Sequence, residues 1–229
     1  MVMVAQARPS ERAEFIKRTY THLAGAVGAF VVVEFLFFQL GIAKLLANVF
    51  LGGSRFGWLA LLGGFALLGY LASNMASKAD DVNAQYTGLG LYVVGEAIIF
   101  APLLYAAVYY TQDPSVLPTA AIITLFLFGG LTAVAFTSGK DFSFLGGILN
   151  IAGMVALGLI VCSLLFGFSL GLIFSFFMVA FAGAAILYKT SNVMYRYSTT
   201  QHVAASLELF AAVMLLFWYV LRILMSSRR

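Results

Sequence analysis

Long apolar runs constrain this chain more than any other feature of its sequence. A helix that crosses about 30 Å of hydrocarbon at about 1.5 Å per residue needs roughly 20 residues. Runs of approximately this length cover residues 20–41, 57–73, 89–110, 117–137, 144–165, 168–188 and 204–225. Helices satisfy their backbone polar groups internally, which lipid requires. The sequence therefore predicts an all-α integral membrane protein, a bundle of seven transmembrane helices.

The connection at Gly167 decides the number of spans. Gly167 separates the fifth run from the sixth, and merging the two would leave six spans and move the C-terminus to the other side. Other connections, such as 112–116 and 138–143, are also short. Short connections force consecutive helices to lie antiparallel as neighbours.

The composition agrees with lipid as the solvent of this chain. It is 62% hydrophobic and 10% charged, whereas a soluble domain carries roughly 25% charged residues. We expect a charged cytoplasmic N-terminal arm (1–19), one membrane domain (20–225) and a short tail (226–229). The arm either anchors the first span or lies in the interface as a short amphipathic helix. The arm has no apolar centre, so no cleavable signal peptide is expected.

The positive charges predict an orientation. With seven spans, one side collects Arg8, Arg12, Lys17, Arg18, Lys78, Lys140, Lys189 and Arg196, and the other collects Lys44, Arg55, Arg222, Arg228 and Arg229. Lys and Arg are enriched on the cytoplasmic side, so the N-terminus is predicted inside and the C-terminus outside. The longest predicted loop, 74–87, holds Asp80 and Asp81 on the inner side. The net charge of +4 is spread out, which argues against nucleic-acid binding.

Three acids lie within predicted spans: Glu34, Glu96 and Glu208. An ionisable side chain at this depth is costly, so a functional role is the default interpretation. Glu96 lies about seven residues, or roughly 11 Å, from the inner end of its span, and Glu208 about four to five residues from its own. These two acids are expected at one depth, with Glu34 nearer the outer face. The structural alternative for each is a neutral or hydrogen-bonded acid that only fixes helix packing.

Residues 186–224 hold the remaining ionisable residue of interest. Lys189, at the edge of the sixth run, is the nearest opposite charge in sequence to Glu208. A buried acid with a detachable cationic partner is a candidate proton-sensitive switch, whereas the alternative for Lys189 is snorkelling to the interface. Asp141 is interpreted first as part of a solvated turn.

Other chemistry is not predicted. His22 and His202 are isolated, and the single cysteine, Cys162, lies in an apolar run, so neither a disulfide nor a metal site is expected. The chain has no phosphate loop, HExxH or GxSxG motif. We therefore expect no enzyme and no cofactor.

Four stretches resemble the Bax inhibitor-1 family, which includes bacterial YccA-like members. They are GLGLYVVGEAIIFAP at 88–102, TLFLFGGLTA at 124–133 followed by KDFSFL at 140–145, ILY and TSN within 186–192, and FWYVLRIL at 217–224. The resemblance implies a seven-helix fold whose last helix is central. It also implies a passive, pH-dependent Ca²⁺ leak, with Ca²⁺ as the transported ion.

This chain departs from the family at the pH-sensing latch. The resemblance implies two aspartates there, but Lys189 occupies the first position and Ala212 the second. Glu208 precedes Ala212 by one helical turn and shares its face. We therefore expect a Lys189–Glu208 ion pair that breaks at acid or alkaline extremes, and a path that is closed or only weakly gated by pH.

Two functions follow as alternatives. The first is a cation leak lined by Glu96 and Glu208 and closed by Lys189, with Glu34, Arg222 and Asp141 as secondary candidates. The second is a non-transporting interaction protein that regulates a partner such as a membrane-anchored AAA protease, or accompanies a larger complex. Its expected partner-binding residues are Arg12, Lys17 and Arg18. The expected location is a prokaryotic plasma (inner) membrane, with the endoplasmic reticulum as the alternative.

Overall fold

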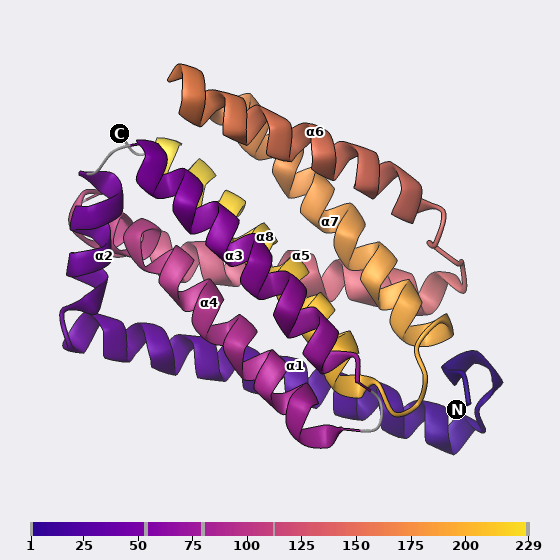
Figure 1. Cartoon of the computed structure of the whole chain (residues 1–229). Helices are drawn as coiled ribbons and strands as arrows, with labels where there is room; N and C mark the ends of the chain where they lie inside the picture. The colour runs from indigo at the N-terminus through magenta and orange to yellow at the C-terminus, as the bar shows by residue number, and fades with distance from the viewer. Residues whose placement is uncertain (1, 53–54, 79–80, 112, 228–229) are drawn as a thin grey trace.

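The protein, seen in a computed structural model, is a bundle of long helices (Figure 1). The structure describes residues 2–52, 55–78, 81–111 and 113–227. A short 3₁₀ turn, η1 (Val4–Gln6), comes before the helices of the bundle. In the described residues these are α1 (Pro9–Gln39), α2 (Ile42–Leu51), α3 (Arg55–Ala76), α4 (Val82–Tyr109), α5 (Val116–Ser138), α6 (Leu145–Phe166), α7 (Gly171–Tyr195) and α8 (His202–Ser227).

Seven of these helices are long and apolar enough to cross a membrane, as predicted. The division between the fifth and sixth spans is confirmed, because α6 ends at Phe166 and α7 begins at Gly171. Gly167 has a φ of 77° and Gly171 a φ of 66°, a left-handed conformation that glycine adopts without a Cβ clash. The termini therefore lie at opposite ends of the bundle (Figure 1).

Several boundaries differ from those predicted. The loop predicted over 74–87 is wrong: α3 continues to Ala76 and α4 begins at Val82, where Asp81 accepts a hydrogen bond from Ala84 N at 2.9 Å. Asp80 lies outside the described residues. The first helix begins at Pro9 and runs without a break into the span, and α2 occupies part of a predicted connection. An apolar run covers only the part of a helix that lies in hydrocarbon. The helix itself, held by backbone hydrogen bonds, extends beyond that part, so its ends are not marked by the apolar run.

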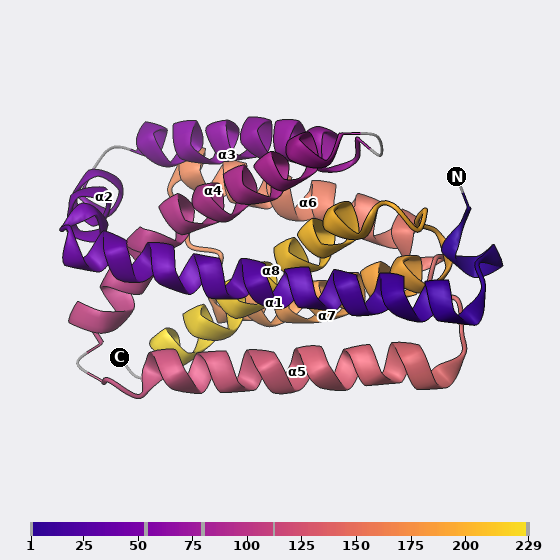
Figure 2. The same ribbon diagram turned by 90° about the horizontal axis from the view of Figure 1, so that it is seen from below.

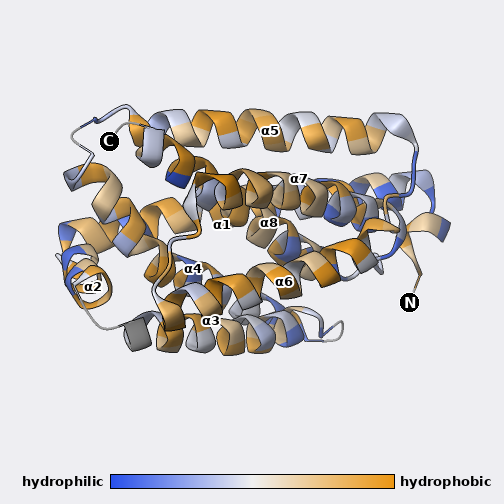
Figure 3. Cartoon of the chain, turned by 90° about the horizontal axis from the view of Figure 1, so that it is seen from above, coloured by the Kyte–Doolittle hydropathy of each residue, from blue (hydrophilic) through white to orange (hydrophobic). Residues whose placement is uncertain are grey.

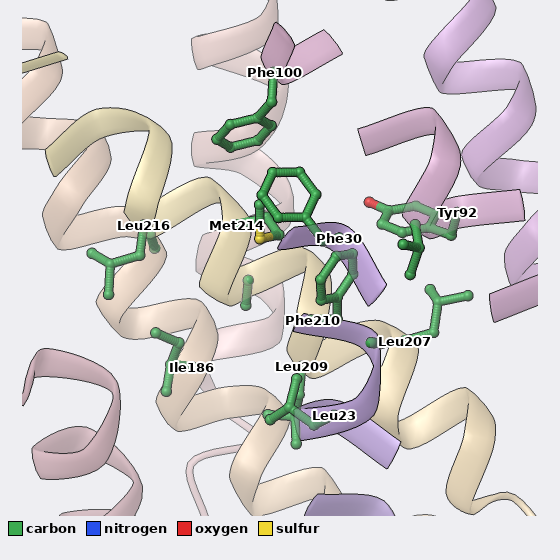
Figure 4. Packing of buried hydrophobic residues seen from close by; sticks show 14 of the residues in the cluster. Leu23, Phe30, Tyr92, Phe100, Ile186, Leu207, Leu209, Phe210, Met214 and Leu216 are labelled. Carbon is green, nitrogen blue, oxygen red and sulfur yellow. The ribbon is translucent and has the colours of Figure 1, made fainter. Parts of the chain in front are cut away.

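The last helix, α8, is central, as the family resemblance implied. It packs against α1, α3, α4, α5 and α7 (Figures 1 and 2). Its contacts include an aromatic cluster in which Phe210 meets Tyr92 edge to face, and Phe30 meets Phe100 with ring centroids 5.3 Å apart (Figure 4). Such pairs contribute roughly 0.5–1.5 kcal/mol beyond the area they bury. The core therefore lies along α8.

The outer surface of the bundle is apolar over most of its length. Hydrophobic residues cover the middle of the helices and hydrophilic residues gather toward the two ends (Figure 3). The chain is an integral membrane protein with this surface in the lipid bilayer. The most peripheral helix is α6, which packs only on α7 and α3 and buries a single residue, Ala156.

The segment before α1 is fastened to the α7–α8 loop. Val4 N donates to Tyr197 O at 2.9 Å, Thr199 N donates to Val2 O at 3.2 Å, and Met3 forms an isolated antiparallel bridge with Ser198. The Val4 side chain is fully buried. The N-terminal arm, in which the partner-binding residues were expected, is thus partly packed on its own chain.

Candidate functional site

The turn between α7 and α8 brings Lys189 beside Glu208. Because the two helices are antiparallel neighbours, the end of α7 faces the beginning of α8. Lys189 Nζ donates a hydrogen bond to Glu208 Oε2, and the two side chains are 27% and 33% exposed. The ion pair predicted from the sequence is therefore present, at a position that is neither fully buried nor freely solvated.

A cavity of about 790 Å³ adjoins this ion pair. It lies between α3, α4, α6, α7 and α8, and its lining includes Glu96, Lys189 and Glu208. Its volume is in the range of roughly 300–1,000 Å³ found for small-molecule sites. Glu96 is 6% exposed. Glu96 and Glu208 both line this cavity, but not at the expected common depth: Tyr92 and Phe100, on either side of Glu96, contact Phe210 and Phe217 of α8, which places Glu96 about one and a half turns beyond Glu208.

Arg222 lines the same cavity at its other end. It follows Glu208 on α8 by about 14 residues, which corresponds to roughly 21 Å of helix. The cavity thus extends from the Lys189–Glu208 ion pair toward the end of the bundle that carries the C-terminus (Figure 1).

The third acid, Glu34, does not join this site. It lies on α1, outside the lining of the 790 Å³ cavity. Both of its carboxyl oxygens are buried without a hydrogen-bond partner among the described residues. The structure therefore separates Glu34 from the other two acids.

Asp141 is more than a solvated turn residue. Its Oδ1 accepts hydrogen bonds from Ser143 N at 2.9 Å and from Ser191 Oγ at 3.1 Å, and Ser191 Oγ accepts from Phe142 N at 3.0 Å. The Ser143 N–H, then the Ser191 hydroxyl and the charge of Arg196, hold the pKa of Asp141 below its ordinary value. The α5–α6 loop is thereby fastened to α7 two residues beyond Lys189.

Removing the Ser191 hydroxyl should loosen this attachment. In Ser191→Ala the Phe142 N–H loses its partner and Asp141 loses a donor, so we expect a loss of about 1–3 kcal/mol. Because the folded pKa of Asp141 is lowered, its stabilising contribution is complete above the ordinary pKa and disappears as the pH falls through the lowered value. Thermal unfolding in detergent at neutral and acid pH measures both effects. A variant as stable as the native protein at neutral pH would contradict this role of Ser191.

Two histidines meet where α1, α4 and α8 come together. His22 Nδ1 lies 2.7 Å from Arg18 O and Nε2 lies 2.7 Å from Tyr86 OH, and the His22 and His202 ring centroids are 4.9 Å apart. A carbonyl oxygen only accepts, so in the neutral ring Nδ1–H donates to Arg18 O and Nε2 accepts from Tyr86. In the described part of the chain, no three His, Cys, Asp or Glu side chains gather as a metal site would need.

The basic residues of the N-terminal arm are partly engaged within the chain. The Arg12 guanidinium lies 5.6 Å from the centroid of the Tyr195 ring, and Arg18 Nε donates to Glu14 Oε1 at 2.8 Å. Lys17 is exposed and forms no ion pair with another described residue. Arg18 is exposed as well, but its guanidinium is bonded to Glu14.

Comparison with known proteins agrees with the fold. A family described as "Inhibitor of apoptosis-promoting Bax1" matches residues 12–229. The chain is 31% identical to the uncharacterized protein PA2604 of Pseudomonas aeruginosa over 163 residues, 70% of each chain. It is 28% identical to Bax inhibitor 1 of Schizosaccharomyces pombe over 234 residues, which is 96% of this chain and 79% of the yeast protein.

A third relative, from a plant, matches a shorter stretch. The BI1-like protein of Arabidopsis thaliana is 36% identical over 114 residues, 46% of this chain and 43% of the relative. The family match covers all seven membrane-crossing helices apart from the first turn of α1. The chain therefore belongs to the Bax inhibitor-1 family.

Proposed function

We propose that this protein is a passive cation leak, with Ca²⁺ as the ion, whose path uses the 790 Å³ cavity. One observation carries the proposal: Glu96 and Glu208 line a single cavity, and Lys189 forms an ion pair with Glu208. Carboxylate oxygens are the ligands that Ca²⁺ prefers. Two acids that line one membrane cavity are thus suited to binding a cation. One of them, Glu208, is already paired with Lys189.

The Lys189–Glu208 pair is the closing element of this path. Its ammonium group neutralises Glu208, so an entering cation no longer meets a free carboxylate there. The two opposite charges in contact stabilise each other, so the pair holds the path closed. The native protein is accordingly closed, or only weakly gated by pH.

The orientation and the membrane are part of the same proposal. The distribution of Lys and Arg supports a cytoplasmic N-terminus and an outer C-terminus, in a prokaryotic plasma membrane. The Lys189–Glu208 pair then closes the cytoplasmic end of the path.

Ca²⁺ flux into liposomes that contain only the purified protein tests the proposal. Native protein is expected to give low flux that changes little between about pH 6 and pH 8. Strong flux with a steep pH dependence in that interval would contradict a constitutive pair. Unchanged stability and flux in Glu208→Gln would remove the support for the pair.

A second candidate function is an interaction protein that regulates a membrane-anchored AAA protease. The observation that favours it is that Lys17, on the first turns of α1 beside Arg18, is exposed and forms no ion pair with another described residue. Deleting the arm is a poor test, because Val4 is buried and bonded to the α7–α8 loop. Lys17→Glu leaves those contacts in place. Loss of a co-purifying protease in this variant, without any flux from native protein, favours interaction over transport.

A further inference from the structure

The end of the cavity opposite the Lys189–Glu208 pair carries a cation that has no carboxylate partner among the described residues. Arg222 is half-buried on the penultimate turn of α8 and lines the cavity. The two ion pairs among the described residues are Arg18–Glu14 and Lys189–Glu208, so no described carboxylate pairs with Arg222. Ser163 and Ser169, from the end of α6 and the connection to α7, line the cavity as well. The Ser163 hydroxyl donates to Ile160 O at 2.9 Å, so this end offers an anion the Arg222 guanidinium and the Ser169 hydroxyl.

Between its two polar ends the cavity is mainly apolar. Ile99 and Phe100 of α4 face it, together with Ala211, Leu215 and Trp218 of α8. The distance along α8 from Arg222 to Glu208 is roughly 21 Å, which exceeds half of the ~30 Å hydrocarbon core. A hydrocarbon chain of one membrane leaflet therefore fits within this length, and burying it against these walls is favourable.

The cavity also borders the bilayer. Its outer wall includes α6, the helix that packs only on α3 and α7. The other face of α6 exposes large apolar side chains, such as Ile151 and Met154, to lipid. A membrane-dissolved molecule thus reaches the cavity by passing beside a single peripheral helix.

We propose that this cavity binds a single-chain anionic amphiphile, a long-chain carboxylate, with its head on Arg222 and its chain directed toward Glu96. The forked N–H groups of arginine match the two oxygens of a carboxylate. At the far end Lys189 is already paired with Glu208, and Glu96 repels an anionic head from the middle of the cavity, so the head is directed to Arg222. Of the two cations that line the cavity, Lys189 is paired with Glu208, which leaves Arg222 and one elongated, mainly apolar cavity for one head and one chain.

The binding is separate from ion conduction but uses the same space. A bound chain occupies the volume that the proposed leak needs, so adding the amphiphile should reduce any Ca²⁺ flux. Binding itself is measured without an ion gradient. If the protein shows no Ca²⁺ flux, amphiphile binding can still be observed. If it binds no amphiphile, a Ca²⁺ leak can still be observed.

Photo-crosslinking of the purified full chain with a diazirine-bearing palmitic acid tests the site. We expect saturable labelling of cavity residues, reduced on the order of tenfold or more in Arg222→Gln because a charge-assisted hydrogen bond is lost. The matched control is Lys44→Gln, which removes a charge from an exposed position on α2 at the same end of the bundle. Ala211→Phe, which fills the cavity within one turn of Glu208, where the chain would end, should also reduce labelling.

Equal labelling of Arg222→Gln and Lys44→Gln would overturn the proposal. So would equal labelling of the native protein by the primary amide of the same probe, a comparison that needs no folded variant. A two-chain phospholipid probe that labels the same residues and competes equally would overturn the single-chain assignment.

Discussion

Replacing Lys189 with alanine should raise Ca²⁺ flux through the purified protein roughly tenfold at neutral pH. Exposed ion pairs contribute about 0.2–1 kcal/mol, whereas breaking a buried pair costs about 3–5 kcal/mol. The Lys189 and Glu208 side chains are 27% and 33% exposed, so their coupling lies between these limits. A shift of about 1.4 kcal/mol between closed and open states changes their ratio tenfold. The measurement is dye-reported flux into liposomes.

Two comparisons make this result specific to the pair. Arg18→Ala breaks the exposed ion pair with Glu14 and removes one positive charge from the same end of the bundle, so it should leave the flux unchanged. A double-mutant cycle with Glu208→Ala isolates the interaction from the separate effects of the two residues. Lys189→Ala with the flux of the native protein would show that the pair does not close the path.

Replacing Gly88 with alanine should be the most destabilising single substitution proposed for this fold. A Cβ at Gly88 would lie 2.5 Å from Ala72 O and 2.8 Å from Ala76 N. These are backbone atoms of α3, so no side-chain rotation relieves the clash, and the two helices must separate. Overpacking of this kind costs up to about 3 kcal/mol, or roughly 6–12 °C in melting temperature for a chain of this size.

Gly90→Ala is the matched control, because Gly90 is on the same helix, α4, but on an exposed face. A Cβ at Gly90 meets no atom within 4 Å, and alanine is a better helix former than glycine by up to about 1 kcal/mol. Thermal unfolding in detergent should therefore show a loss for Gly88→Ala and no loss for Gly90→Ala. Equal melting temperatures would mean that α3 and α4 do not need their close approach.

The clash at Gly88 also explains part of the family motif at 88–102. Small residues at an interface allow two membrane helices to approach closely, and here Gly88 faces Ala72 and Ala76, which are both buried. The helix that Gly88 holds close, α3, supplies Trp58, Leu62 and Phe65 to the cavity wall. We therefore expect Gly88→Ala to disturb the cavity as well as the stability.

The candidate site was partly predictable from the sequence. Lys189 and Glu208 lie on consecutive spans joined by a short connection, so their pairing follows from an antiparallel hairpin. The meeting of Ser191 with Asp141, which are 50 residues apart, carries no local signal. The same is true of Val4 against Tyr197. Contacts of this kind depend on which helices become neighbours, and the hydropathy of a sequence does not predict which helices these are.

By itself the sequence determined the membrane class, the seven spans and the family, because apolar length and local motifs are properties of contiguous residues. Helix ends were less predictable, since α1 and α4 begin several residues before the apolar runs that marked them. Only the tertiary structure decided that α6 is peripheral, that Glu34 stands apart and that Arg222 shares a cavity with Glu96 and Glu208. The physical reason is that lipid solvates every apolar helix face alike, so the packing of side chains, rather than hydrophobicity, selects which faces meet.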